Sequence, residues 1–470
     1  MRTLKLLFTS DEHGHIRKAP RVQNLINKAK AENPNTLLVS SGDIFQGTPE
    51  SDLFNGKPSL DVIKEAGYDL IELGNHDFDN GVPFVKEWLK KADYPILAGN
   101  VIEESTGERL PGAEAYKVFE MGDVKLGLIG VVTPETKTAS FKENVEGLEF
   151  LEPAPVVEQA KKELEAQGVN LIGVISHLGL GEDKKLAADV DGIDFILGGH
   201  SHLALEEPRI VGDTLICQPG SFRDHLGSLE ISLDKERGTI VSFEHQLISV
   251  AEGEEEQTSV LDTVQKVTKK LDEANDTIVT QAKFDLRHDH RKENSLGYVA
   301  SESMREATGA PIALLNLKSQ RADISRGDVT AGDIYKAFPF PNKVVKARVR
   351  RSDLLKAIAL SEERKDHRSL TRHHMKIEFE SGSQGTPNCR IKDCILKDDP
   401  NPESEFVEIA TNDYLAQGGL GYFKDAEVIS EHGFQRDVLE DYLDKHIEPA
   451  HSDYQKAELS SKEIFKNLSY

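Results

Sequence analysis

Five short polar motifs in the first half of the chain combine carboxylate, amide and imidazole side chains. Cysteine is absent from all five, so these donors suit Mn, Fe, Zn, Co or Mg and disfavour Cu(I) and iron–sulfur clusters. Each motif alone is weak evidence, because a single Asp or His after a strand is more often structural. Together they predict a metal centre. The motifs contain Asp11 and His13, Asp43, the group Asn75, His76, Asp77 and Asp79, His177, and His200 with His202.

Each motif follows a short apolar run rich in Val, Ile and Leu. The runs begin near Lys5, Asn35, Asp69, Leu171 and Ile193. Runs of this length, bounded by Gly, Asp, Asn or Ser, predict buried strands, and helical patterns lie between several of them. Alternating strands and helices predict an α/β fold whose strands are buried on both faces. The polar motifs would then lie at the carboxyl ends of strands, along one rim of the sheet.

From residue 251 onward the pattern of residues changes. Residues 251–257 are acidic, and the stretch 258–275 places Val260, Val264, Val267 and Leu271 at helical spacing. This predicts an amphipathic helix that docks one face. A chain of 470 residues exceeds one compact core, so we expect two domains with a boundary between about 245 and 280. Segment 389–396 is expected to form a hairpin that turns at Lys392 and Asp393.

The charge balance excludes some classes of protein. The chain has 57 Lys and Arg against 81 Asp and Glu, a net charge of −24. This argues against gripping a nucleic acid polymer or an anionic membrane, because both need clustered positive charge. If the substrate is a phosphate, something local must reverse this field. Three cysteines exclude a disulfide framework. The first apolar run is too short for a signal peptide or a membrane span, so a cytoplasmic location is expected.

The order of the five motifs resembles the signature of the calcineurin-like dinuclear metallophosphoesterases. The form GNHDFD, the segment RADISRGDVTAGDIY from Arg321 and the segment ATNDYLAQGGLGY from Ala410 resemble the bacterial 5′-nucleotidase family in particular. This resemblance implies a four-layer αββα sandwich followed by a smaller mixed α/β substrate-binding domain. The implied domains are a metallophosphoesterase domain at 1–250, a linker helix at 251–280 and a 5′-nucleotidase C-terminal domain at 281–470.

The same resemblance implies a centre of two divalent metal ions, whose identity (Mn, Zn, Fe, Co or Mg) the sequence leaves open. A metal-bridging hydroxide would attack the phosphate, and the centre would keep a net charge of about +1 to meet it. His76, oriented by Asp79, would assist the transition state. Asp43 would bridge the two metal sets. One set would be Asp11, His13, Asp43 and His202, and the other Asp43, Asn75, His177 and His200.

In the second half, the resemblance implies substrate binding by Arg321, Tyr422, Gly418 and Gly419, with Tyr422 stacking on a base. The sequence departs from the family pattern nearby. The usual glycines are missing from the segment 316–320, Leu420 replaces a common Asp, and no clear second aromatic residue is present, although the histidines at 373 and 374 could stack. The basic run 365–376 suggests either a solvated face or a contact with an anion.

We therefore expect an enzyme that hydrolyses a nucleotide phosphomonoester and releases nucleoside and phosphate. The expected partner is a small phosphorylated substrate, with no nucleic acid polymer and no membrane; the sequence indicates no oligomeric state. Two alternatives use the same centre: a 2′,3′-cyclic-nucleotide phosphodiesterase and a nucleotide-sugar hydrolase. A non-catalytic nucleotide-binding protein is an alternative of another class. It would have lost a ligand or His76, and neither is lost.

Overall fold

The protein divides into two compact units, residues 1–269 and 270–469, in the computed structural model. The structure describes residues 2–121, 124–234, 240–250, 258–289, 292–363, 369–380, 390–396 and 399–446. The boundary falls within helix α8 (Ser259–Asn275), and the four apolar residues predicted to share one face of this helix are all buried. The acidic segment 251–257 and the C-terminal residues 447–470 lie outside the described residues.

Two six-stranded sheets form the first unit, with the orders β14-β13-β1-β2-β3-β4 and β11-β12-β10-β9-β7-β6. The strands of the first sheet are β1 (Arg2–Thr9), β2 (Thr36–Ser40), β3 (Leu70–Glu72), β4 (Ile96–Leu97), β13 (His225–Leu233) and β14 (Ile240–Ser249). Those of the second are β6 (Tyr116–Met121), β7 (Val124–Val132), β9 (Leu171–His177), β10 (Phe195–Gly198), β11 (Arg209–Val211) and β12 (Thr214–Cys217).

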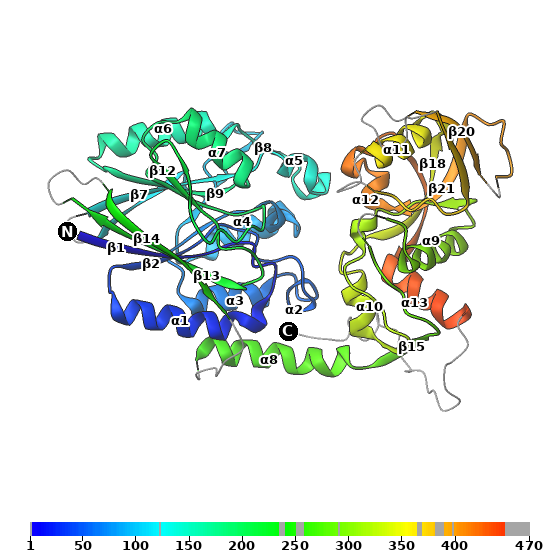
Figure 1. The fold of residues 1–470 in the computed structure, drawn as a ribbon, viewed down its shortest axis with the longest axis horizontal. Helices are drawn as coiled ribbons and strands as arrows, with labels where there is room; N and C mark the ends of the chain where they lie inside the picture. The colour runs from blue at the N-terminus through cyan, green and yellow to red at the C-terminus, as the bar shows by residue number, and fades with distance from the viewer. Residues whose placement is uncertain are drawn as a thin grey trace. The chain divides into compact units, whose positions relative to one another are not determined.

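The sheets pack face to face between two layers of helices. Leu6 and Phe8 of β1 meet Leu128 and Phe195 of the second sheet in one buried core. Helices α1 (Ala19–Glu32) and α3 (Lys57–Ala66) cover the outer side of the first sheet (Figure 1). Helices α6 (Pro153–Ala166) and α7 (Leu180–Asp189) bury Val157, Leu164 and Leu186 against the second sheet. The expected four-layer αββα sandwich is confirmed.

Shorter elements connect these layers and shape the rim at the strand ends. They are α2 (Pro49–Asp52), α4 (Val82–Lys91), α5 (Thr136–Ala139), β5 (Val101–Glu103), β8 (Leu148–Phe150) and the 3-10 helices η1 (Ile16–Lys18), η2 (Asn75–Phe78) and η3 (Lys142–Asn144). Strands β1 to β4 run parallel to one another, and so do β7, β9, β10 and β12. In each sheet the carboxyl ends of these strands therefore point to the same edge, as the sequence predicted.

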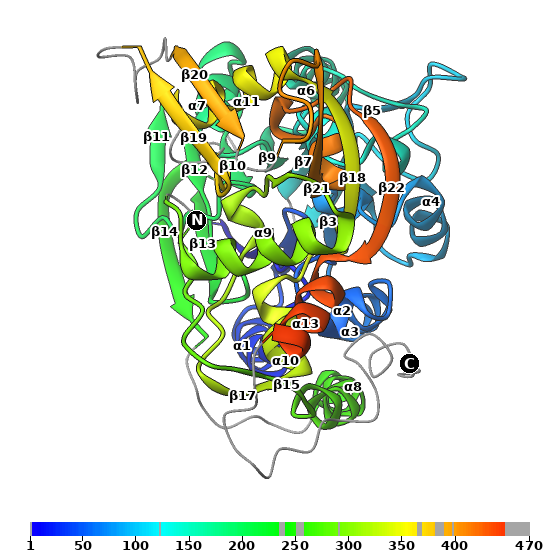
Figure 2. The same cartoon turned by 90° about the vertical axis from the view of Figure 1, so that its right-hand side faces the viewer.

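The second unit is built on a mixed sheet with the order β16-β21-β18-β22. Helices α11 and α12 contribute Leu354, Ile358 and Leu415 to its core, and α9 packs with α13 (Figure 2). The strands are β16 (Ile312–Ala313), β18 (Lys343–Arg350), β21 (Phe406–Asn412) and β22 (Glu427–Phe434), with β15 (Ile278–Ala282), β17 (Gly327–Thr330), β19 (Met375–Phe379) and β20 (Ile391–Leu396) in two small sheets. The helices are α9 (Ser295–Thr308), α10 (Ala331–Ala337), α11 (Arg351–Glu363), α12 (Asp413–Ala416), α13 (Gln435–His446) and the short η4 (Leu317–Ser319) and η5 (Gly419–Gly421).

The hairpin predicted within 389–396 is wrong. Lys392 and Asp393 continue strand β20, which pairs antiparallel with β19. A tight two-residue hairpin turn favours residues that tolerate positive φ, Gly above all. The expected turn at Lys392 and Asp393 contains no Gly, and the next residue is Cys394. No helix among the described residues has the length and apolar character needed to cross a membrane.

Candidate metal centre

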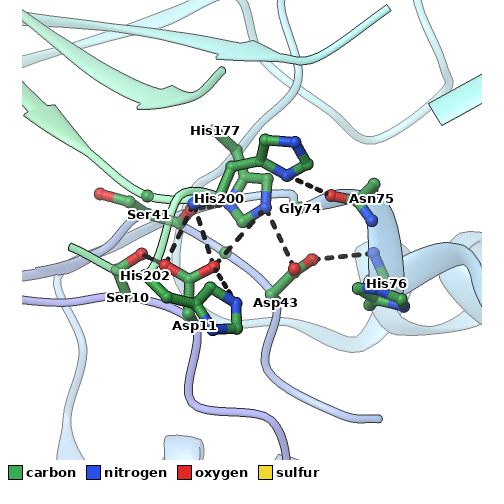
Figure 3. Close-up of polar contacts among 12 residues, drawn as sticks. Ser10, Asp11, Ser41, Asp43, Gly74, Asn75, His76, His177, His200 and His202 are labelled. Atoms are coloured by element: carbon green, nitrogen blue, oxygen red, sulfur yellow. Dashed lines mark hydrogen bonds and ion pairs between the residues drawn. The ribbon is translucent and has the colours of Figure 1, made fainter. Parts of the chain in front are cut away.

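The predicted ligands lie together at the rim where parallel strands of both sheets end. They come from five separate segments, and Figure 3 shows the side chains of six of them pointing toward one another: Asp11, Asp43, Asn75, His177, His200 and His202. Asp11 follows β1, Asp43 follows β2, Asn75 follows β3, His177 is the last residue of β9, and His200 and His202 follow β10.

One group of donors consists of Asp11, His13 and His202, whose ligand atoms all lie within 4.8 Å of one another. His202 Nε2 is 3.3 Å from Asp11 Oδ1 and 3.1 Å from His13 Nε2. Two imidazole nitrogens that face each other at this distance beside a carboxylate form a cluster that a cation would stabilise.

A second group consists of Asp11, Asp43 and His177. His177 Nε2 lies 3.1 Å from Asp43 Oδ2 and 3.9 Å from Asp11 Oδ1. Asp43 Oδ2 is also 3.6 Å from His13 Nε2, so this carboxylate lies between imidazoles of both predicted sets. Asp11 belongs to both groups, which the sequence did not indicate. Bridging by Asp43 stays a prediction.

The amide of Asn75 and the ring of His200 extend the second group. His200 Nδ1 lies 2.9 Å from Asn75 Oδ1 (Figure 3). Burial lowers the pKa of His200 to about 4, and it lowers the pKa of His13 to about the same value. Both rings are therefore neutral at pH 7, the form that offers a lone pair to a metal.

Backbone carbonyls orient two of the imidazoles, and sequence reasoning did not identify them. His13 Nδ1 donates to Gln46 O at 2.7 Å, and His177 Nδ1 donates to Ser41 O at 2.6 Å. In His13 the proton is then on Nδ1, and Nε2 turns its lone pair toward the cluster. Burial opposes a charge on His177, but the carboxylates of Asp43 and Asp11 outweigh it and raise the pKa of this ring to about 9, so its Nε2 proton faces them until a cation replaces it. No signal in the sequence marks these carbonyls, because every residue has one.

The donor set fits divalent cations. His177 Nε2 is buried and has no hydrogen-bond partner among the residues that the structure describes, although it faces two carboxylates. A buried polar atom without a partner is costly unless something else satisfies it. Carboxylate, amide and imidazole donors without sulfur suit Mn, Zn, Fe, Co or Mg.

The backbone at these positions is strained. Five predicted ligands adopt the left-handed conformation, with φ of 50° at Asp11, 47° at His13, 57° at Asp43, 71° at His200 and 57° at His202. Such conformations are uncommon for residues other than glycine and tend to cluster at functional sites. Two glycines allow the loops to approach. A Cβ at Gly74 would lie 2.2 Å from Asp43 Oδ1, and one at Gly42 would lie 2.4 Å from Gly74 N.

His76 and Asp79 form a pair at the edge of the cluster. His76 Nδ1 lies 2.7 Å from Asp79 Oδ2, and the His76 backbone N–H donates to Asp43 Oδ1 at 2.8 Å. Burial opposes the charged ring, but the carboxylates of Asp79 and Asp43 outweigh it and raise the pKa of His76 to about 10. The ring is about one third exposed, so it can reach a bound molecule.

Two buried aspartates support the loops without joining the ligand groups. Asp77 accepts backbone N–H groups from Asp43 at 3.0 Å, Ile44 at 2.8 Å and Gly74 at 2.8 Å, which ties two ligand loops together. Asp183 accepts from Ser176 Oγ at 2.5 Å and from Gln218 Nε2 at 2.9 Å. Burial raises the pKa of each carboxyl to about 7.

The network around Asp183 reaches the other side of the centre. Gln218 Oε1 accepts from Ser201 Oγ at 2.6 Å. Ser176 directly precedes one predicted ligand, and Ser201 lies between two others. The network therefore holds the ends of β9 and β10 in register.

The predicted substrate residues of the second unit do not form a comparable cluster. Arg321 is exposed, and its guanidinium lies 4.9 Å from the ring centre of Phe340, a residue that the sequence analysis did not single out. Gly418 has φ of 95° in a turn before η5, and Gly419 is buried against Tyr414.

Tyr422 is the clearest departure from expectation. It is 1% exposed and belongs to the hydrophobic core of the second unit, where it packs near Phe423. Its ring presents no open face in this structure, and stacking of this ring on a base stays a prediction. The sequence does not distinguish a stacking tyrosine from a core tyrosine here, because either kind could follow this glycine-rich turn.

The described part of the basic run has acidic neighbours. Arg372 pairs with Glu362 and Glu293, and His374 contacts Glu302. His373 packs edge to face against Tyr298, with ring centres 4.8 Å apart. These contacts favour a structural role over binding an anion, and residues 365–368 of the run lie outside the described residues.

Comparisons with known proteins agree with this geometry. Residues 4–204 match the calcineurin-like phosphoesterase family, and residues 267–425 match the 5′-nucleotidase C-terminal domain. The chain belongs to the 5′-nucleotidase-type metallophosphoesterase family. Calcineurin-like metallophosphoesterases use two divalent metals, and the two donor groups described above provide places for them.

Individual relatives are similar over most of the chain. The Trifunctional nucleotide phosphoesterase protein YfkN of Bacillus subtilis is 25% identical and aligns with 89% of this chain, although the chain spans only 32% of that protein. Protein UshA of Yersinia enterocolitica is 26% identical, with 96% of this chain and 92% of that protein covered. The crystal structure of a 5′-nucleotidase precursor from Thermus thermophilus has a TM-score of 0.80 and 26% identity, covering 94% and 96% of the two chains.

Proposed function

We propose that this 5′-nucleotidase-type hydrolase cleaves the phosphate monoester of a nucleotide and releases nucleoside and phosphate. The observation that supports this most directly is the His76–Asp79 pair beside the donor cluster, with its backbone bonded to Asp43. A metal cluster with an adjacent proton donor suits phosphoryl transfer. The names of the relatives, which include a nucleotide phosphoesterase and 5′-nucleotidases, support a nucleotide as the substrate.

We assign the residues of the centre as two overlapping sets. Asp11, His13 and His202 hold one cation together with Asp43, and Asp43 is shared with the second set. The second set is completed by Asn75, His177 and His200. When bound, the cations supply Lewis acidity and positive charge for phosphoryl transfer. They also explain how a chain with a net charge of −24 accepts a phosphate, because the field is reversed locally without Lys or Arg.

The chain itself supplies a positioned proton donor. Asp79 accepts the Nδ1 proton of His76 and fixes the ring, which leaves Nε2 directed away from the pair. A proton on Nε2 can pass to the leaving oxygen of the ester or hydrogen-bond to a phosphoryl oxygen as negative charge develops there. Both roles require His76 to approach the substrate, and its partial exposure permits this.

In the second unit we propose substrate contacts by Arg321 and by the turn at Gly418 and Gly419, a smaller set than the sequence suggested. Arg321 is exposed beside Phe340, so a guanidinium and an aromatic ring are available together to a phosphate or a base. The Gly418 and Gly419 turn allows close approach of backbone. The cytoplasmic location stays a prediction.

A substrate panel tests this proposal. The full-length protein is freed of metal, reloaded with Mn, Zn, Co or Mg, and assayed for phosphate release from nucleoside 5′-monophosphates, 2′,3′-cyclic nucleotides and nucleotide sugars. We expect the monophosphates to have the highest kcat/KM with at least one metal. Faster turnover of cyclic nucleotides or nucleotide sugars would replace the proposed substrate, and no turnover of any ester would refute the activity.

A further inference from the structure

The segment around Phe222 and Arg223, which follows β12, packs directly against the loop that carries Asp11 and His13. The Phe222 backbone N–H donates to Asp11 O at 2.8 Å. The Phe222 ring lies 5.7 Å from the ring centre of His13, 5.3 Å from that of His202 and 4.6 Å from that of His15. Phe222 therefore forms a wall behind two predicted metal ligands, and its position bears on theirs.

The backbone of this segment is in an unfavourable conformation. Phe222 has φ of 59°, and Arg223 has φ of 55°. The left-handed region is disfavoured for bulky side chains, and two such residues in succession persist only when the surrounding structure holds them. Neither residue is a predicted ligand, so the strain here requires a separate explanation.

A buried ion pair holds the segment in place. Arg223 Nη2 donates to Glu12 Oε2 at 3.0 Å, and the two residues are 3% and 0% exposed. Glu12 also accepts from Thr9 Oγ1 at 2.5 Å and from Tyr68 OH at 2.8 Å. The carboxylate of Glu12 is thus satisfied on both oxygens, deep in the first unit.

Stability alone does not account for such a pair. A buried ion pair is often no more stabilising than apolar residues of the same volume, whereas loss of one partner leaves an uncompensated charge. The location of the pair is more informative. Glu12 stands between Asp11 and His13 in the chain, so a shift of its backbone would also shift the backbone of both.

We infer that Glu12 and Arg223 are a positioning pair for the metal centre, which fixes the Asp11–His13 loop against the Phe222 wall. This inference rests on the proposed metal-dependent function. The pair also balances the charge of Glu12, a buried acid that is adjacent to Asp11 in the chain. Because the pair would act by orienting Asp11 and His13, its loss should lower the affinity for metal directly.

Metal affinity provides the test. Mn²⁺ binding to the metal-free full-length chain is measured by titration calorimetry for the wild type, Glu12→Gln, Arg223→Met and the double variant. Residues that orient metal ligands typically change affinity by about 10- to 100-fold, and we expect losses of this size in each single variant. The loss in the double variant should be smaller than the product of the two single losses, since the residues act as a unit.

Two further variants keep the test decisive. Arg223→Gly removes the guanidinium but suits the left-handed backbone, so it serves if Arg223→Met fails to fold. Arg223→Lys keeps the charge and should recover part of the affinity. Asp399→Asn is the matched control: the Asp399 side chain is 5% exposed and pairs with Arg351 in the second unit, so this change should lower the melting temperature and leave Mn²⁺ affinity unchanged.

Single variants that bind Mn²⁺ within about twofold of the wild type, with lowered melting temperatures, would show that the pair is merely structural and would overturn the inference. If the wild type binds Mn²⁺ and the variants bind it weakly, the inference stands even when no ester is hydrolysed; only the proposed activity then fails. A wild type that binds no divalent metal would overturn both.

Discussion

The rim of the first unit and the predicted substrate residues of the second show two different relations between sequence and site. In the first unit, seven predicted ligands converge because each follows or ends a strand of a parallel set. In the second unit, Arg321 is exposed while Tyr422 is buried in the core. Strand ends impose a common location on the side chains that follow them, whereas residues in separate turns have no such constraint. The order of residues along the chain therefore constrains the position of the metal ligands more strongly than the position of the predicted substrate residues.

Asp43→Asn should give the largest effect, since it tests whether one carboxylate serves both donor groups. Loss of its charge should reduce the affinity for both metals, and hydrolysis should fall by about 10³-fold or more, because metal ions supply several kcal/mol of transition-state stabilisation. Metal content by mass spectrometry and phosphate release measure the two effects. Retention of two metals at wild-type occupancy would contradict the bridging assignment.

Tyr422→Ala tests the second region. Truncation of a large aromatic side chain in a core costs about 3–5 kcal/mol, so denaturant unfolding should show a loss of that order. Tyr422→Phe keeps the ring and serves as the control. If Tyr422 instead stacked on a base, Tyr422→Ala would raise KM and leave the free energy of unfolding nearly unchanged.

His76→Ala separates proton donation from metal binding within the first region. We expect metal content to remain at the wild-type value while kcat falls by about 100-fold, the lower part of the usual range for general acid–base catalysis. Asp79→Asn should cause a smaller loss, since Asp79 acts only through the ring of His76. Unchanged hydrolysis in His76→Ala would exclude the role proposed for this residue.

Glu72→Gln should give the smallest effect, and it asks whether every buried acid near the rim belongs to the centre. Glu72 is 0% exposed and points toward β7, where a Cβ on Gly130 would lie 1.8 Å from its Oε2. Burial, with the charge of Asp77, raises the pKa of Glu72. When the pKa of an acid is higher in the folded state than in the unfolded state, the folded protein becomes less stable as the pH rises above the unfolded pKa, which is near 4.5 for Glu72.

The wild type and Glu72→Gln should therefore have similar melting temperatures near pH 4, and the variant should melt at a higher temperature than the wild type near pH 8. Glu149→Gln, an exposed acid on β8, is the control and should leave the pH profile unchanged. If the melting temperature of the wild type instead rose above that of Glu72→Gln as the pH increased, Glu72 would be ionised and paired in the folded protein.

The limits of sequence reasoning appear at particular residues. Asn100 follows β4 in the same kind of motif as the predicted ligands, yet its side chain bonds to Val132 N and O and to Leu151 O. The sequence alone could not distinguish this structural amide from Asn75. Arg223 and Phe222 gave no signal, because an Arg and a Phe more than 200 residues after Asp11 have no pattern that links them to it.

The sequence by itself determined which chemistry is available. The order of carboxylate, amide and imidazole residues after apolar runs was sufficient to predict a layered α/β fold and a metal centre at one rim, because strand polarity places those residues at one edge. The tertiary structure alone decided how the centre is held and what lies in the core. The carbonyls that turn His13 and His177, the Glu12–Arg223 pair and the burial of Tyr422 all depend on contacts between segments far apart in the chain. Such contacts arise from packing, which no local pattern of residues encodes.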